Sequence, residues 1–318
     1  MSSAHTQEGL VVGSHGRHCL VESADGTRRI CHAKGKKNQT VVGDRVSWLA
    51  SADEGRIETV LPRRNLMYRQ DEMRTKSFAA NIDQVLVLLG AEPEFSERQL
   101  ARALIAAEAE GIDVAVALNK QDVQPAFDRA WQRLSPYRSM GYAVMPLAMK
   151  PDSGEAPAGA AELKNWLSGK TTLVLGPSGA GKSTLVNHCV PHAQAQTGEI
   201  SRALNSGKHT TTSTTWYWLD DEHKAALIDS PGFQEFGLRH IEPMDLPRWM
   251  PDLRAHLGEC RFHNCTHLHE PGCGVREHVA EDGESAASPN GLAQQAIHPN
   301  RYQIYAELFA ELTEPPRY

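Results

Sequence analysis

Eight residues near the middle of the chain have the pattern of a phosphate-binding loop. They run from Gly176 to Ser183 and read G-P-S-G-A-G-K-S. Glycines in such a loop let backbone amides turn inward around phosphate oxygens. We expect Lys182 to neutralise the β- and γ-phosphates of a nucleotide, and the Ser183 hydroxyl to bind Mg²⁺. The residues expected to contact the nucleotide here are Gly176, Pro177, Ser178, Gly179, Ala180, Gly181, Lys182, Ser183 and Thr184.

A second motif has the N-K-x-D pattern of a guanine-specific pocket and comprises Asn119, Lys120, Gln121 and Asp122. A carboxylate can accept hydrogen bonds from the ring N–H and the exocyclic amine of guanine, a donor pair that adenine lacks. We expect Asp122 to read guanine in this way, Lys120 to lie along the base, and Asn119 to brace the phosphate loop. This motif precedes the phosphate loop, whereas it follows the loop in an ordinary GTPase. Because a pocket needs walls that are close in space, the inverted order indicates a circularly permuted GTPase.

A third motif, Asp229-Ser230-Pro231-Gly232, matches the D-x-x-G pattern of GTPases. Asp229 is expected to hold Mg²⁺ through its water shell, and the Gly232 amide to contact the γ-phosphate. An ordinary Asp-Ser-Pro-Gly turn is the alternative interpretation. The position of the motif at the end of an apolar run, after the phosphate loop, favours the nucleotide site.

The threonine-rich segment 207–215 lies between the phosphate loop and D-x-x-G. We expect Thr211 to bind Mg²⁺ and the γ-phosphate as a switch, with Thr210 as second candidate. Phe233 stands where many GTPases carry a glutamine that orients the attacking water, and a phenyl ring cannot do this. His209 is therefore the candidate catalytic residue. A solvated loop with an exposed histidine is the alternative.

Three cysteines and a histidine lie within fourteen residues: Cys260, Cys265, His267 and Cys273. Three thiolates and one imidazole form a closed tetrahedral Zn²⁺ site, and closed sites are structural. We therefore expect one structural zinc ion. The competing histidine ligands are His263, His269 and His278, and a set of free thiols is the alternative.

The elements that position these motifs can be predicted from the apolar pattern. Strands are expected at 82–89, 112–118, 171–175 and 225–228, and each of the last three ends where a nucleotide motif begins. Ser96 and Gln99 form a capping box that begins a helix, which ends at Gly111. Strand–helix–strand units of this length form parallel sheets that bind ligands at the carboxyl ends of their strands.

The pattern before residue 65 is different, because five short runs are separated by turn residues and none has helical spacing. Such a segment is typical of a small OB-like barrel, and the polar residues 63–77 that follow are interpreted as a linker. We therefore predict a multi-domain chain. The predicted units are an OB-like β-barrel at 1–65, a permuted α/β P-loop GTPase domain at 74–237 and a helical zinc-binding domain at 238–318.

Bulk composition argues against a generally basic nucleic-acid-binding protein, because the 318 residues carry a formal net charge of −6. Charge is uneven, however, since residues 1–65 hold ten Lys/Arg against seven Asp/Glu. That segment could meet a phosphate backbone. No stretch approaches the roughly 18 apolar residues of a membrane span, and the N-terminus lacks the regions of a signal peptide. We expect a cytoplasmic monomer without membrane contact.

The combination of barrel, inverted nucleotide motifs and Cys₃His segment resembles the RsgA (YjeQ) family of small-ribosomal-subunit biogenesis GTPases over nearly the whole chain. The resemblance implies GTP hydrolysis to GDP stimulated by the 30S subunit, a role in late 30S maturation and contact with 16S rRNA. It also implies that His209 matches the family's catalytic switch histidine. The chain departs from the family in having no Lys or Arg in Met1–Gly9, and no serine in Leu147-Ala148-Met149 to support the base.

Two other functions remain as alternatives. A P-loop kinase of a small metabolite would retain Gly176–Ser183 but would not need Asp122. A non-catalytic RNA-binding module would use nucleotide only structurally. The permuted order also suggests a signalling route, because residues 233–237 lead from D-x-x-G directly toward the zinc segment.

Overall fold

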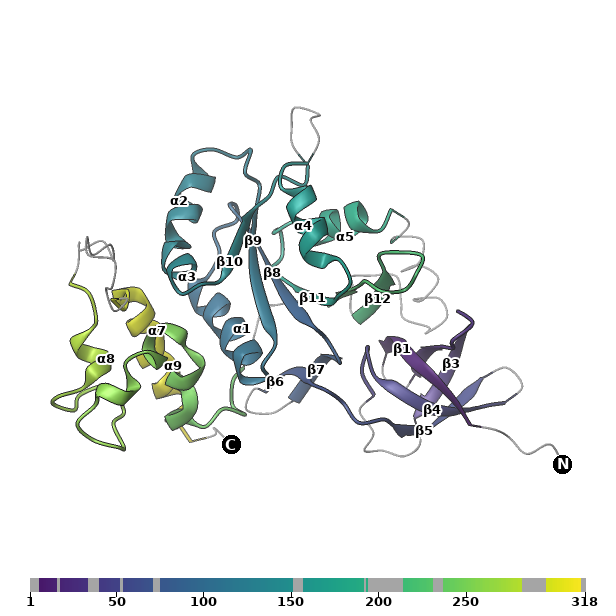
Figure 1. Cartoon of the computed structure of the whole chain (residues 1–318), viewed down its shortest axis with the longest axis horizontal. Coiled ribbons are helices and arrows are strands. Elements are labelled where there is room, and N and C mark those ends of the chain that lie inside the picture. Colours follow the sequence, from purple (N-terminus) through teal and green to yellow (C-terminus); the bar gives the residue numbers. More distant parts are fainter. Residues whose placement is uncertain are drawn as a thin grey trace.

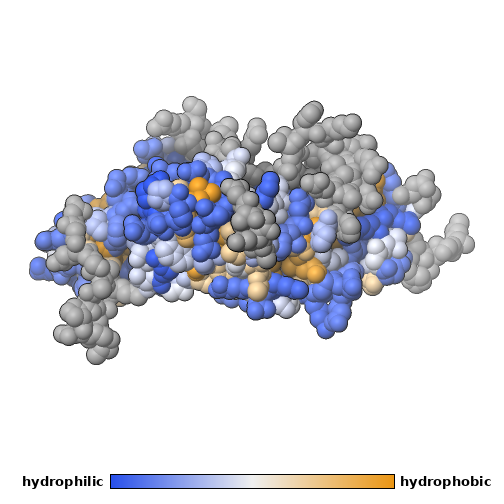
Figure 2. Space-filling view, turned by 90° about the horizontal axis from the view of Figure 1, so that it is seen from above, coloured by the Kyte–Doolittle hydropathy of each residue, from blue (hydrophilic) through white to orange (hydrophobic). Residues whose placement is uncertain are grey.

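The computed structural model describes residues 6–15, 18–33, 40–51, 54–70, 75–150, 157–191, 193, 214–230, 237–281 and 296–315. Figure 1 shows a barrel at the N-terminal end, a central sheet with helices, and a C-terminal region of short helices on the opposite side of the sheet domain. In the view of Figure 2 the described surface is mainly hydrophilic, and hydrophobic residues are visible in limited areas. No helix in the described ranges is long and apolar enough to span a membrane.

The first five strands close into a barrel, as the sequence predicts. They are β1 (Gln7–His15), β2 (His18–Glu22), β3 (Arg28–Ala33), β4 (Arg45–Ala50) and β5 (Gly55–Val60). β1 pairs with β2 and β4, and β3 pairs with β2 and β5. A β4–β5 pair completes the ring. Alternation along the strands buries Val11, Cys19, Val21, Cys31, Val46, Trp48 and Ile57 inside it.

The central domain contains a six-stranded sheet in the order β10-β9-β8-β11-β13-β12. The strands are β8 (Gln84–Gly90), β9 (Asp113–Asn119), β10 (Ala143–Pro146), β11 (Thr171–Leu175), β12 (Thr214–Trp218) and β13 (Ala226–Asp229). All neighbouring pairs are parallel except β12–β13. Thus the strands expected before the three nucleotide motifs all exist.

Helices cover both faces of this sheet (Figure 1). One core contains Val85, Val87 and Leu89 of β8, and the other contains Leu86 and Leu88. Helices α1 (Glu97–Ala109), α2 (Ala126–Arg133) and α3 (Ser135–Ser139) contribute to the first core, and α4 (Ala160–Leu167) and α5 (Lys182–Cys189) to the second. Burial on both faces explains why β8 reads as a continuous apolar run.

The segment interpreted as a linker is a hairpin instead. β6 (Leu66–Gln70) and β7 (Thr75–Ala80) pair in antiparallel fashion. Met67 and Phe78 are almost fully buried in the core that contains α1. The sequence shows no apolar–polar alternation here, because Met67 and Phe78 are few among polar neighbours. These two side chains are buried against distant segments of the chain.

The C-terminal region consists mainly of short helical elements. They are η1 (Pro243–Trp249), α7 (Pro251–Arg254), η2 (Leu257–Glu259), α8 (Gly274–Glu277) and the longer α9 (Pro299–Thr313). One face of α9 buries Ile304, Tyr305, Leu308 and Phe309. These residues share a single hydrophobic core with α1 and β8, so the region packs directly on the sheet domain.

Candidate functional site

The phosphate-loop motif connects β11 to the first turn of α5, which begins at Lys182. Gly179 and Gly181 have φ angles of 81° and 96°, values that favour glycine. Gly176 has no room for a side chain, since a Cβ there would lie 2.5 Å from the Leu88 carbonyl oxygen. The glycines are therefore required by backbone geometry at these three positions.

Asn119 brings the base motif into contact with the phosphate loop. This residue ends β9, and its strand is separated from β11 only by β8. Its buried amide donates to the Ala180 carbonyl at 3.0 Å. A Cβ at Gly181 would lie 2.3 Å from the same nitrogen, so a larger residue would break the contact. Two motifs 61 residues apart thus form one edge of the sheet.

Lys182 and Asp229 face each other across the ends of β11 and β13. The Lys182 ammonium donates to the Asp229 carboxylate and, at 2.6 Å, to the carbonyl of Ser230. Both side chains are largely withdrawn from solvent. The cation expected at the phosphates and the carboxylate expected near Mg²⁺ therefore lie in one small volume.

Asp122 and Lys120 lie in the turn that follows β9. Lys120 has a φ of 70°, and its ammonium donates to the carbonyl of Glu92. The Asp122 side chain is exposed and thus accessible to a base. Asp122 and Lys182 lie at the same end of the parallel strands, as the permuted arrangement requires.

The loop after β10 also belongs to this site, although the sequence analysis assigned no base contact there. Leu147 accepts a hydrogen bond from the Gln121 amide at 2.9 Å, and the Met149 amide donates to the Asn119 side chain at 3.1 Å. The loop contributes backbone groups to these contacts, so the side chains of Leu147 and Met149 do not indicate the contacts in the sequence. The family resemblance and the position of the loop at the end of the strand next to β9 both point to it.

Several predicted site residues cannot be placed. His209, Thr210, Thr211, Gly232 and Phe233 lie outside the described residues. Their expected roles in the switch and in catalysis therefore remain predictions.

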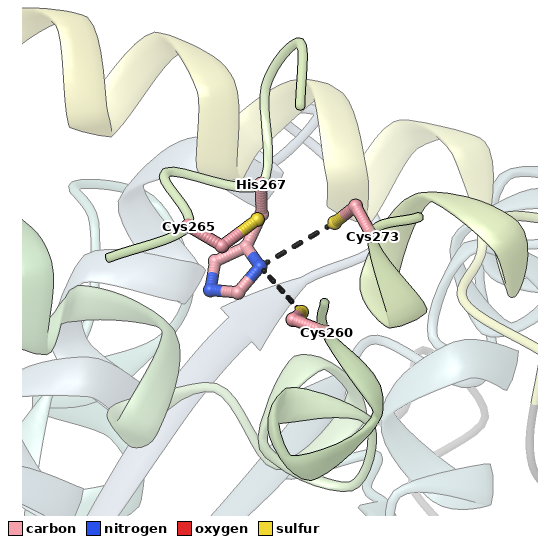
Figure 3. A group of neighbouring side chains, drawn as sticks. All are labelled: Cys260, Cys265, His267 and Cys273. Atoms are coloured by element: carbon pink, nitrogen blue, oxygen red, sulfur yellow. Dashed lines mark hydrogen bonds between the residues drawn. The ribbon is translucent and has the colours of Figure 1, made fainter. Parts of the chain in front are cut away.

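The four predicted metal ligands come together in the C-terminal region (Figure 3). The Nδ1 atom of His267 lies 3.4 Å from the sulfur of Cys260 and 3.5 Å from that of Cys273. All four ligand atoms, including the Cys265 sulfur, lie within 4.8 Å of one another. Tetrahedral zinc with ordinary bond lengths would separate sulfur from nitrogen by about 3.6 Å. The donor set and its spacing fit such an ion.

The surroundings of this cluster hold the ligands in position. Tyr302 and Tyr305 of α9 donate to the carbonyls of His267 and Thr266 at 2.8 and 2.7 Å. Glu270 accepts from the amide and hydroxyl of Thr266. These hydrogen bonds fix the chain directly after Cys265 and attach the ligand loop to the C-terminal helix.

Burial changes the protonation of the ligand side chains in a consistent way. Burial raises the pKa of Cys265 to about 12 and raises the pKa of Cys273. Burial also lowers the pKa of His267, which favours the neutral imidazole that metals bind. Without a cation the thiols would be protonated at neutral pH, so metal binding would release protons.

Comparison with known proteins identifies the family. A model described as RsgA GTPase matches residues 60–239 of the chain. This chain belongs to the RsgA GTPase family. A small ribosomal subunit biogenesis GTPase RsgA of Variovorax paradoxus (strain S110) is 63% identical over 307 residues, which cover 96% of this chain and 93% of that protein. The protein of that name from Burkholderia pseudomallei (strain K96243) is 51% identical over 293 residues, covering 92% and 91%.

Two solved structures have the same fold over nearly the whole chain. YjeQ from Thermotoga maritima is 29% identical, with a TM-score of 0.68 and coverage of 97% of this chain and 99% of that one. YloQ, described as a circularly permuted GTPase, is 26% identical, with a TM-score of 0.67 and coverage of 100% and 99%. Membership in the RsgA GTPase family confirms the permuted GTPase interpretation. It makes the chain a GTP hydrolase, which uses Mg²⁺ with its nucleotide.

Proposed function

We propose that this chain binds the small ribosomal subunit and hydrolyses GTP to GDP and phosphate during late 30S assembly, so that hydrolysis times factor release. The contact of Asn119 with Ala180 carries the GTPase part of this proposal, because it joins a guanine motif to a phosphate loop. The ribosomal part rests on the names of the Variovorax and Burkholderia relatives. We infer 16S rRNA contact by a monomer in which the barrel contributes basic residues.

The nucleotide site in this proposal uses the residues at the ends of β9, β11 and β13. Asp122 and Lys120 hold the guanine, and the amides of 176–184 with Lys182 hold the phosphates. Ser183 and Thr211 bind Mg²⁺, and Asp229 holds it through water. Binding requires the Lys182 ammonium to exchange its contacts with Asp229 and Ser230 for phosphate oxygens.

Catalysis is assigned to His209, which orients the attacking water in place of the missing glutamine. Replacing His209 with alanine should lower turnover while GTP affinity is retained, because the residue acts on water rather than on the base. Turnover equal to that of the parental protein would favour the non-catalytic RNA-binding alternative.

The metal in this proposal is one structural Zn²⁺ bound by Cys260, Cys265, His267 and Cys273. The closed set of four donors leaves no position for a substrate, which supports a structural role. The ion would stabilise the 260–273 loop against α9 and thereby keep the C-terminal region folded.

The decisive experiment is GTP hydrolysis with and without purified 30S subunits. We expect strong stimulation by 30S subunits and none by 50S subunits as the matched control. An excess of ATP should not inhibit, because Asp122 discriminates against adenine. ATP that displaces GTP equally well would favour the P-loop kinase, and absence of stimulation would refute the ribosomal part of the proposal.

We also infer that the segment after D-x-x-G transmits the nucleotide state to the C-terminal region. The Gln70 amide donates to the Gly237 carbonyl at 3.0 Å, and the Arg239 amide donates to the Gln70 carbonyl at 3.0 Å. The chain is thus attached to β6 at Gly237 and Arg239, where it passes toward the C-terminal region. A flexible Gly/Ser insertion after Gly237 should therefore leave hydrolysis intact but slow release from 30S subunits. Normal release by that variant would contradict the route.

A further inference from the structure

The loop between β8 and α1, residues 91–96, contacts both halves of the nucleotide site. The Ala91 amide donates to the carbonyl of Asn119 at 3.0 Å, and the Glu92 carbonyl accepts from the ammonium of Lys120. A Cβ at Gly179 would lie 3.0 Å from the Pro93 ring, so the phosphate loop packs closely on the same segment. A displacement of this loop would therefore change the base contact and the phosphate contact together.

Arg133, the last residue of α2, holds this loop from its other side. Its guanidinium donates to the carbonyl of Phe95 at 3.0 Å and to the carboxylate of Glu94 at 2.6 Å. It also lies 4.5 Å from the centre of the Phe95 ring. The remaining contact is to Glu97 at 2.9 Å. One planar side chain thus makes four contacts that no smaller cation could make at once.

Glu97 connects this arrangement to the C-terminal region. One carboxylate oxygen accepts from Arg133, and the other accepts from the side-chain amide of Asn300 at 2.5 Å. Asn300 is the second residue of α9, two positions after the helix N-cap at His298. The side chain of Glu97 is only 13% exposed, so these hydrogen bonds are partly shielded from water.

A cavity of about 610 Å³ lies beside this network. Its lining includes Glu92 and Phe95 of the loop, residues of α2 and His298 of the C-terminal region. The loop borders open space on this side, so the hydrogen bonds from Arg133 add to the packing of Phe95 in holding its position.

We propose that Arg133 and Glu97 are positioning residues through which docking of α9 controls nucleotide release. Docking of Asn300 orients Glu97, Glu97 orients Arg133, and Arg133 holds the 91–96 loop against Lys120 and Gly179. Loss of docking loosens the loop and accelerates nucleotide dissociation. The proposal rests on the nucleotide site described above. It adds a route on the base side, separate from the D-x-x-G segment.

The test measures dissociation of a fluorescent GDP analogue from the full-length protein. Asn300→Asp places a second carboxylate beside Glu97 and should accelerate dissociation by roughly 2- to 30-fold, the range measured for mutations that couple sites without touching a ligand. Arg133→Lys keeps the charge but not the fork, and should have an effect in the same direction. The matched control is Gln303→Ala, which removes an exposed hydrogen bond between Gln303 and Glu307 within α9 itself.

The control should leave the dissociation rate unchanged. Asn300→Ala replaces Asn300→Asp if the latter fails to fold, as judged by circular dichroism. A purely structural role would lower the urea unfolding midpoint of the Asn300 and Arg133 variants without changing GDP dissociation, and that result would overturn the proposal. Failure of the parental protein to bind GDP in preference to ADP would instead refute the nucleotide site itself.

Discussion

Single residues of this chain act by joining segments that are distant in the sequence. Asn119 is the clearest case, because its amide group contacts the phosphate loop through Ala180 and the loop after β10 through Met149. Both contacts are buried, and an unmade hydrogen bond there would cost about 1–3 kcal/mol. The base motif therefore supports the phosphate loop through Asn119.

At the residue scale, Asp122→Asn should change base preference. An asparagine can accept only one of the two guanine donors, so GTP affinity should fall by about 2–4 kcal/mol, or roughly 30- to 1,000-fold. Xanthosine triphosphate should bind better, because its oxo group can accept from the new amide. Equilibrium binding of both nucleotides measures the change, and Asp128→Asn on the exposed side of α2 is the control. Unaltered GTP affinity in Asp122→Asn would show that Asp122 does not read the base.

Secondary-structure elements connect the three parts of the chain. β1 of the barrel pairs with β12 of the GTPase domain, with Gly13 opposite Thr215 and Ser14 opposite Thr214. The Trp218 indole donates to Glu22 at 2.8 Å near the same junction. β12 begins at Thr214, three residues after the predicted switch residue Thr211. We expect a movement of that switch to displace β12 and, through their pairing, β1 of the barrel.

At the element scale, the 260–273 loop should depend on metal. The purified protein should contain one zinc ion per chain by elemental analysis, and Cys273→Ser should abolish it because a closed site needs all four donors. Cys189→Ser is the control, since Cys189 is a partly buried thiol outside the cluster. Metal release should accelerate on acidification, because protons compete for the raised-pKa thiols of Cys265 and Cys273. Full zinc content in Cys273→Ser would contradict this ligand assignment.

On the scale of the whole molecule, the C-terminal region and the GTPase domain behave as one packed unit. Arg301 of α9 is 2% exposed and donates to Asp252 of α7 at 2.8 and 3.1 Å. Its guanidinium carbon lies 5.2 Å from the ring centre of Tyr137 in α3. This ion pair lies within the C-terminal region and contacts the GTPase domain through Tyr137, so separation of the two parts would expose the pair together with their shared core.

Asp252→Asn should therefore destabilise the whole chain. The substitution leaves the Arg301 guanidinium buried without its counter-ion, at a cost of about 3–5 kcal/mol in the free energy of unfolding. Asp245→Asn, which removes an exposed ion pair with Arg248, should cost no more than about 1 kcal/mol. Urea unfolding monitored by circular dichroism measures both. Equal effects would mean that the buried pair does not stabilise the fold more than an exposed one.

The sequence by itself determined the strands and motifs whose signals are local. Continuous apolar runs predicted β8, β9 and β11, and Ser96 with Gln99 predicted the start of α1, where Ser96 accepts from the Gln99 amide. The cysteine spacing predicted the ligand set that the structure brings together. These features depend on neighbouring residues, so a linear pattern is sufficient to reveal them.

Only the tertiary structure decided how these pieces meet. The hairpin of β6 and β7, the pairing of β1 with β12, and the loop at Leu147 depend on contacts to distant segments, which a local sequence pattern does not reveal. The partners of Arg133 likewise cannot be predicted from local sequence, because they lie on the 91–96 loop and at the start of α1. Such contacts form because a folded chain must satisfy buried polar groups wherever they lie, and their partners are set by packing and not by spacing in the sequence.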